Sequence, residues 1–229
     1  MDLGLPEQVR WIQWRCKGVS NVVVLITGDM DNKGVGAWEQ GGGGHPAPPV
    51  YDSYFGPHHE EPAFQLLPAL LKPKSRGVLR LASRDVHDFP LMDPRYFSHP
   101  EDVKVCVAAT KFALDLVTAK ALKEDLGTKI WDIPFPACKR HSLWSEEYIA
   151  CLCIHFTITV WHYSGTCRMG NGTEAVVSPR LRVRSIRGLR VVDASVMPEI
   201  VSANTNIPVQ MIAMKGAAMI LEDYYAKRG

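Results

Sequence analysis

Histidine is the residue type in this chain best suited to acid–base chemistry near neutral pH. The 229 residues include eight histidines, and His162 lies in the most distinctive surroundings, the segment WHYSGTCRMG at residues 161–170. An unperturbed imidazole titrates at about pH 6.5, so it can accept a proton from a hydroxyl group. A histidine taken alone is more often structural, so residue type by itself selects none of the eight.

The six cysteines raise the questions of a metal site and of disulfides. Cys151, Cys153 and His155 form a C-x-C-x-H pattern. Residues two apart point in opposed directions on a helix, so only Cys151 and His155 share a face, and zinc would need further ligands. We therefore expect no metal site. Six cysteines are too sparse for a disulfide-built miniprotein of this length, and we expect mostly free, buried thiols.

A pair of glycines near the N-terminus resembles the start of a dinucleotide-binding fingerprint. Gly34 and Gly36 fit the first two glycines of G-x-G-x-x-G, but Glu39 stands at the third. No later stretch supplies the motif. Four consecutive glycines and three prolines nearby are typical of a flexible connection.

Composition is that of an ordinary globular protein, with 46% hydrophobic and 22% charged residues. The 26 Lys and Arg nearly balance the 24 Asp and Glu, giving a formal charge of +2. This balance does not favour binding to nucleic acid or to a membrane surface. No apolar run approaches the roughly 20 residues of a transmembrane helix. We expect a small-molecule partner, with no nucleic acid and no membrane.

Short apolar runs predict several strands. These runs are VVVLI at residues 22–26, GVLRLA at 77–82 and GLRVVD at 188–193, and residues 156–161 also have a β-like pattern. His162 is therefore expected at the end of a strand.

Three segments predict helices. Ser98 and Glu101 have capping-box spacing, and Ser145 is followed by two glutamates at the positive end of a second helix. Asn206 is the expected cap of the last helix, with Pro208 in its first turn. Two apolar stripes support the first and last helices: Val103, Val107, Leu114 and Val117; and Val209, Ile212, Ala213, Gly216, Ala217, Ile220 and Leu221.

Three parts of the chain together resemble the glucose-methanol-choline (GMC) family of flavin oxidoreductases. Residues 161–170 are similar to the family signature, in which a histidine precedes a small residue, Gly, Thr and often Cys. Residues 175–221 resemble the C-terminal block almost throughout. Upstream, FQLLPALLKPKSRGVLRLAS and FPLMDPRYFSHPEDVKV are similar to the body of the substrate domain. Residues 1–60 match no part of the family, so we separate them from a GMC C-terminal domain at residues 61–229.

The resemblance implies a fold and two catalytic residues. The fold is α+β, an antiparallel sheet flanked by helices, with a C-terminal strand and helix that would pack on an FAD-binding domain lacking from this sequence. His162 would be the base that takes the hydroxyl proton while hydride passes to flavin. Asn204 would face it across the substrate and orient the hydroxyl. From residue types alone, Asn204 and Asn206 could instead serve only as turn and cap residues.

The resemblance also implies five FAD-contacting residues. Asp193 and Ala194 would approach the ribityl and phosphate region, and Asn206, Ile207 and Pro208 would lie by the flavin ring, where a helix N-terminus stabilises negative charge. Without a cofactor, Asp193 could be an ordinary turn residue.

The chain departs from the family pattern in two places. Ser178 replaces a common Asp, a change expected to be structural, and Tyr163 and Ser164 replace the frequent Pro-x after the histidine. The second change is expected to alter the lining of the pocket and with it the choice of substrate.

Two functions fit these residues. The first is the C-terminal domain of an FAD-dependent oxidoreductase that oxidises the CH–OH group of an alcohol or sugar. The alternative is a truncated, catalytically inactive fragment or a non-redox ligand-binding domain. Because no phosphate-binding loop is found, we expect this chain by itself not to retain FAD.

Cys138 and Cys151 resemble a cysteine pair common in insect-type members, which implies a disulfide between them. Together with the glycosylation sequon Asn171-Gly172-Thr173, a disulfide would point to secretion of the parent protein.

Overall fold

The computed structural model describes residues 22–27, 53–58, 64–125 and 127–226. Two compact units divide the chain: residues 1–80 with 91–158, and residues 81–90 with 159–229. Each unit is described by itself. The expected flexible connection, Gly34, Gly36 and Cys16 lie outside the described residues.

The described part of unit 1 contains two small antiparallel sheets. Strand β1 (Val22–Thr27) pairs with β2 (Gln65–Leu70) in a register that runs from Val22 opposite Leu70 to Thr27 opposite Gln65. The strand predicted at residues 22–26 is confirmed. Pro68 lies within β2, and the free edge of a two-stranded sheet accommodates its missing N–H.

The second sheet is a hairpin of β3 (Val78–Arg80) and β4 (Leu91–Asp93). It confirms the strand predicted at residues 77–82 over its central three positions. The short pairing leaves apolar side chains in solvent, including Leu79 at 52% and Met92 at 69% exposure.

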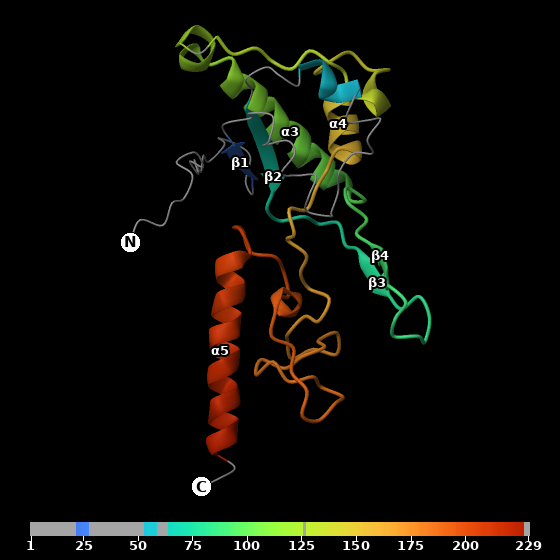
Figure 1. The fold of residues 1–229 in the computed structure, drawn as a ribbon, viewed down its shortest axis with the longest axis vertical. Coiled ribbons are helices and arrows are strands. Elements are labelled where there is room, and N and C mark those ends of the chain that lie inside the picture. Colours follow the sequence, from blue (N-terminus) through green and yellow to red (C-terminus); the bar gives the residue numbers. More distant parts are fainter. Residues whose placement is uncertain (1–21, 28–52, 59–63, 126, 227–229) are drawn as a thin grey trace. The chain divides into compact units, whose positions relative to one another are not determined.

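Helix α3 (Pro100–Val117) packs against β2 and against α4 (Glu146–His155), as Figure 1 shows. The predicted helix is confirmed, but Ser98 as its cap is wrong. His99 is the N-cap, and its Nδ1 accepts a hydrogen bond from the Glu101 N–H at 3.2 Å. Pro100 decides the boundary, because proline fits the first helical position and the residue before it favours an extended backbone.

A buried carboxylate fixes the start of α3. Asp102, 2% exposed, accepts hydrogen bonds from the backbone N–H of Lys74 at 2.9 Å and of Ser75 at 2.8 Å. The Ser75 hydroxyl donates a third at 2.6 Å. Burial raises the pKa of Asp102, but these hydrogen bonds outweigh burial and hold the pKa below its ordinary value.

Helix α4 begins as the sequence predicts. Ser145 is its N-cap, and the Ser145 hydroxyl accepts from the Tyr148 N–H at 3.1 Å, while Glu146 and Glu147 occupy the first turn. The carboxylates stand at the positive end of the helix, where they are favourable.

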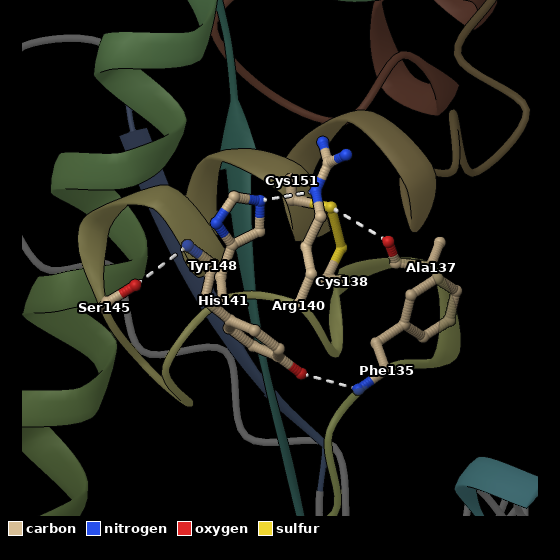
Figure 2. Close-up of a disulfide and its surroundings, with 8 residues drawn as sticks. All are labelled: Phe135, Ala137, Cys138, Arg140, His141, Ser145, Tyr148 and Cys151. Atoms are coloured by element: carbon tan, nitrogen blue, oxygen red, sulfur yellow. Dashed lines mark hydrogen bonds between the residues drawn. A yellow bond between two sulfur atoms is a disulfide. The ribbon is translucent and has the colours of Figure 1, made fainter.

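Two disulfides attach α4 to its neighbours. Cys138 of the 3-10 helix η3 (Pro136–Cys138) bonds to Cys151, with the Cα atoms 5.8 Å apart (Figure 2). This bridge, implied by the family resemblance, is confirmed. Cys106 of α3 bonds to Cys153, with the Cα atoms 6.4 Å apart.

The expectation of mostly free thiols is wrong for these four cysteines. Cys151 and Cys153 point to opposite sides of α4, as spacing of two requires, and each side meets a cysteine from another element. Their sulfurs are therefore not available as thiolate ligands. Of the described cysteines, Cys167 is free.

Aromatic side chains fill the core around the Cys138–Cys151 bridge. The ring of Tyr148 is fully buried, and its hydroxyl accepts from the Phe135 N–H at 2.8 Å (Figure 2). Tyr54 packs edge-on against Phe135 at 5.3 Å between ring centroids. Burial, together with the neighbouring Tyr148, raises the pKa of Tyr54, so its hydroxyl stays protonated.

Unit 2 contains one long helix and a chain of turns. Isolated bridges join Met169 to Val177, Val177 to Val183, and Arg182 to Arg190. The strand predicted at residues 188–193 is wrong. Leu181 takes a left-handed φ of 61° beside the bridge, which interrupts an extended pairing, and the segment forms a single bridge instead.

Helix α5 (Asn206–Tyr225) is the long helix at the C-terminal end of the chain (Figure 1). Its Ile212 belongs to the buried cluster of unit 2, together with Val177, Leu181, Val196 and Met197. Gly216 permits this close packing, since a Cβ there would lie 2.6 Å from Cγ1 of Val192.

The predicted apolar face of α5 is only partly buried. Val209, Ile212 and Gly216 face the cluster, whereas Ile220 is 47% and Leu221 is 53% exposed. Ala213 and Ala217 are exposed as well. The apolar stripe predicted for α5 therefore extends beyond the part of the helix surface that is buried within unit 2.

Asn206 as the cap of α5 is also wrong. Thr205 is the N-cap, and its side chain makes no capping hydrogen bond. Asn206 is the first helical residue, and its Oδ1 accepts from Nε2 of Gln210 at 3.0 Å, one turn along the helix.

A charged cluster holds the C-terminal end of α5. The guanidinium groups of Arg180, Arg182 and Arg190 all pair with the Asp223 carboxylate, and Arg180 also pairs with Glu222 at 2.9 Å. These pairs join the last turn of the helix to the segment 180–190. Among the described helices, none is long and apolar enough to span a bilayer.

Replacing Asp102 with alanine is expected to lower the free energy of unfolding by about 3 kcal/mol. Hydrogen bonds to a charged group contribute about 1.5–3 kcal/mol each, and the partly buried donors of Lys74 and Ser75 would lose their acceptor. Urea denaturation measures the change. Glu101→Ala is the control, because Glu101 immediately precedes Asp102 and lies at the surface beside Lys104. An equal loss of unfolding free energy in both variants would contradict this role for Asp102.

Asp223 is expected to make unit 2 sensitive to acid. A hydrogen bond from Arg182, with the charges of Arg182, Arg180 and Arg190, lowers the pKa of Asp223 from 3.8 to about 2. Because the folded pKa is the lower one, this stabilisation is present above about pH 3.8 and is lost as pH falls toward 2.

Thermal unfolding across that range tests the Asp223 pairs. Asp223→Asn should lower the midpoint near neutral pH, and its difference from wild type should shrink as pH falls. Glu222→Gln, which removes a single partner of Arg180, should have a smaller effect. A difference that stays constant with pH would refute the assignment.

Candidate functional site

His162 follows a turn, and its expected place at the end of a strand is wrong. Helix α4 ends at His155 with Phe156 as its C-cap, and Val160 and Trp161 take left-handed φ values of 51° and 58°. Such a backbone cannot continue a strand. The His162 N–H instead closes the turn by donating to the Thr159 carbonyl at 3.1 Å.

The imidazole of His162 is oriented by this turn. Its Nδ1 is hydrogen-bonded to the backbone carbonyl oxygen of Val160, two residues earlier. A carbonyl oxygen can only accept, so in the neutral ring Nδ1 carries the proton. Nε2 is then the nitrogen with a free lone pair, and it can accept a proton from a substrate.

The segment after His162 lies beside the 3-10 helix η4 (Ala194–Val196). The Cys167 N–H donates to the Ser195 carbonyl at 2.9 Å, and the Met169 N–H donates to the Val196 carbonyl at 2.8 Å. Gly165 allows the approach with a φ of 85°, which disfavours other residues. The structure thus brings the His162 segment and the predicted Asp193–Ala194 site side by side.

Asp193 caps η4. Its Oδ1 accepts from the Ser195 N–H at 2.8 Å and from the Ser195 hydroxyl at 2.5 Å. The side chain is exposed, and Oδ2 makes no hydrogen bond to the described residues. Ala194 packs against the buried cluster of unit 2. Asp193 thus has a turn role, and one carboxylate oxygen is still free to accept.

The segment before α5 presents polar groups to solvent. Asn204 and Asn206 are exposed, and Ile207 is 69% exposed. The N–H groups of Asn206 and Ile207 belong to the first helical turn and have no acceptor within the helix, while Pro208 has no N–H. These two donors stand at the positive end of a 20-residue helix.

No hydrogen bond joins His162 to Asn204 within the part of the chain that the structure describes. Their convergence on one substrate oxygen therefore stays a prediction. In the same described part, no group of three or more His, Cys, Asp or Glu side chains could hold a metal ion.

The groups present fit one part of FAD. The donors of Asn206 and Ile207 suit the electron-rich edge of a flavin ring, and Oδ2 of Asp193 can accept from a ribityl hydroxyl. The phosphates would need a glycine-rich loop, and G-x-G-x-x-G does not occur in the 229 residues.

Sequence reasoning missed two features of the structure. The hydrogen bond between Nδ1 of His162 and the Val160 carbonyl oxygen depends on a left-handed turn, which no residue pattern predicted. The Cys106–Cys153 bridge had a usable signal, because Cys106 adjoins Val107 in the apolar stripe of α3 and Cys153 lies opposite Cys151 on α4.

Comparisons with known proteins identify the family of the chain. The family model described as GMC oxidoreductase matches residues 73–213. The chain is 38% identical over 167 residues to a glucose dehydrogenase (FAD, quinone) of Drosophila pseudoobscura pseudoobscura, covering 72% of this chain and 27% of that protein. It is 40% identical over 151 residues to an alcohol dehydrogenase (acceptor) of Pseudomonas putida, covering 66% of this chain and 26% of that protein.

Among solved structures, a pyridoxine 4-oxidase from Mesorbium loti is similar, with a TM-score of 0.61 and 25% identity. The match covers 86% of this chain and 34% of that one. The fold is therefore that of the C-terminal portion of such an oxidoreductase. The chain belongs to the GMC oxidoreductase family, and it spans about a quarter of the length of the curated relatives that it matches.

Proposed function

We propose that this chain supplies the substrate side of an FAD-dependent oxidoreductase that oxidises the CH–OH group of an alcohol or sugar. The main support is the family match over residues 73–213, which includes His162, Asp193 and Asn204. Relatives named as glucose dehydrogenase, alcohol dehydrogenase and choline oxidase favour a CH–OH donor.

The protein's own part in the reaction is to orient the alcohol and remove its proton. Bound FAD would supply the acceptor for the hydride that leaves the carbon. Nε2 of His162 accepts the hydroxyl proton, and the Val160 carbonyl keeps Nδ1–H in place before and after that transfer. The Asn204 amide donates to the substrate oxygen and so directs the hydroxyl toward His162.

Two sets of groups would position the cofactor. The free N–H groups of Asn206 and Ile207 give partial positive charge to the flavin edge, and Asp193 accepts a hydrogen bond through Oδ2. Tyr163, 62% exposed and next to His162, stands where the family commonly has proline, and it contributes to the choice of substrate.

The isolated chain is expected to purify without stoichiometric FAD. The contacts named above reach only part of the cofactor, and a fraction of the binding groups rarely retains a ligand through purification. Flavin absorbance and fluorescence of purified residues 1–229 provide the measurement. Stoichiometric flavin in that sample would contradict the expectation.

In the full-length oxidoreductase, His162→Ala is expected to slow flavin reduction by alcohol by a factor on the order of 10² or more, since general-base catalysis contributes that much. Asn204→Ala should slow flavin reduction less, because it removes a group that orients the substrate hydroxyl and leaves the base in place. Stopped-flow measurement of flavin reduction gives both rates.

His87→Ala is the matched control, because His87 is an exposed histidine in the 81–90 loop. Its rate should equal that of the wild type. An unchanged rate in His162→Ala would remove the base assignment. A full-length protein that binds no flavin and oxidises no alcohol would favour the alternative, a non-redox ligand-binding domain.

A further inference from the structure

The sequence contains one acceptor motif for N-linked glycosylation. Asn171, Gly172 and Thr173 form N-x-T, and none of the other four asparagines, at positions 21, 32, 204 and 206, has Ser or Thr two residues later. Such motifs also arise by chance, so the structure around the asparagine has to decide.

The three residues of the motif all face solvent. Asn171, Gly172 and Thr173 are exposed, and a Cβ built on Gly172 would have no atom within 4 Å. The Asn171 side chain makes no hydrogen bond to the described residues. Its amide nitrogen is therefore free to react, and the space beside it can hold a bulky group.

Backbone contacts hold the motif in an outward turn. The Arg184 guanidinium donates to the Asn171 carbonyl at 3.0 Å and to the Gly172 carbonyl at 2.9 Å. The Ala175 N–H also donates to the Gly172 carbonyl, at 3.2 Å. These bonds use main-chain acceptors of the turn, so the side chains of Asn171 and Thr173 stay available.

A second, independent observation indicates the cellular compartment in which the chain folds. Among the described residues of unit 1, two disulfides, Cys106–Cys153 and Cys138–Cys151, each join separate elements of the core. Structural disulfides form in oxidising compartments such as the endoplasmic reticulum and are rare in the cytosol. The same compartment carries out N-glycosylation, so a chain that acquires these bridges there also meets the glycosylation machinery.

We infer that Asn171 is an N-glycosylation site of a protein of the secretory pathway. Nδ2 of Asn171 forms a bond to the anomeric carbon of an oligosaccharide carried on a polyisoprenyl diphosphate. The bond between that carbon and the diphosphate oxygen breaks, the amide loses one proton, and the lipid diphosphate leaves. No electrons are transferred.

Expression in eukaryotic cells, with the chain directed into the endoplasmic reticulum by a signal sequence, tests the site. Most of the chain should shift in mass on treatment with peptide N-glycosidase F, which converts a glycosylated asparagine to aspartate. Peptide mapping should place that conversion at Asn171. Because the sequence has a single motif, any such shift reports on this residue.

Paired variants separate the motif from a general effect on folding. Thr173→Ser keeps the motif and should remain modified, whereas Thr173→Ala changes the same exposed position and should abolish the shift completely, as should Asn171→Gln. Non-reducing peptide maps report the disulfides in the same samples. Material retained in the cell is analysed in the same way, because the modification precedes export.

An unmodified Asn171 in chains that carry both disulfides would overturn the site. Chains from the endoplasmic reticulum whose Cys106, Cys138, Cys151 and Cys153 all stay reduced would overturn the inference about the compartment. A shift that persists in Thr173→Ala and in Asn171→Gln would also overturn it.

Discussion

The backbone hydrogen bonds from Cys167 to Ser195 and from Met169 to Val196 are the contacts on which the candidate site depends. The described part of unit 2 is built mainly from turns and isolated bridges, so no extended sheet fixes the place of the His162 segment. Those two bonds join the segment to the turn that Asp193 caps. Because backbone groups make them, the arrangement tolerates changes in the side chains around it.

The buried cluster of unit 2 stabilises the contact between the His162 segment and η4. Val196 is fully buried and Met197 nearly so, and both pack with Val177 and with Ile212 of α5. The absence of a side chain at Gly216 lets α5 approach the chain closely enough to close this cluster. The same packing that stabilises the unit therefore also positions the N-terminal turn of α5, which carries Asn206 and Ile207.

Unit 1 has disulfides in addition to a packed hydrophobic core. Helix α4 has ten residues, too few for a stable helix on its own, and two disulfides attach it to α3 and to η3. The Tyr148 hydroxyl adds a buried hydrogen bond to the Phe135 backbone. The bridges restrict the conformational freedom of the unfolded chain, which favours the folded state of this unit.

The sequence by itself determined the family, the α+β class, the three helices and some local features, although the caps predicted at Ser98 and Asn206 were wrong. Ser145 with its two following glutamates correctly marked the start of α4, and the run at residues 22–26 correctly marked a strand. His162, Asn204 and the FAD-contacting positions came from resemblance to the family, and the match over residues 73–213 contains them all.

Tertiary structure decided what depends on residues far apart in the chain or on unusual backbone. The second bridge needed α3 and α4 to pack with Cys106 facing Cys153, 47 residues later. The left-handed turn at Val160, whose carbonyl oxygen is hydrogen-bonded to Nδ1 of His162, has no signal in residue type, since valine ordinarily avoids that conformation. Local patterns report the preferences of a short segment, whereas these features exist only because the energy of the whole packed unit overrides those preferences.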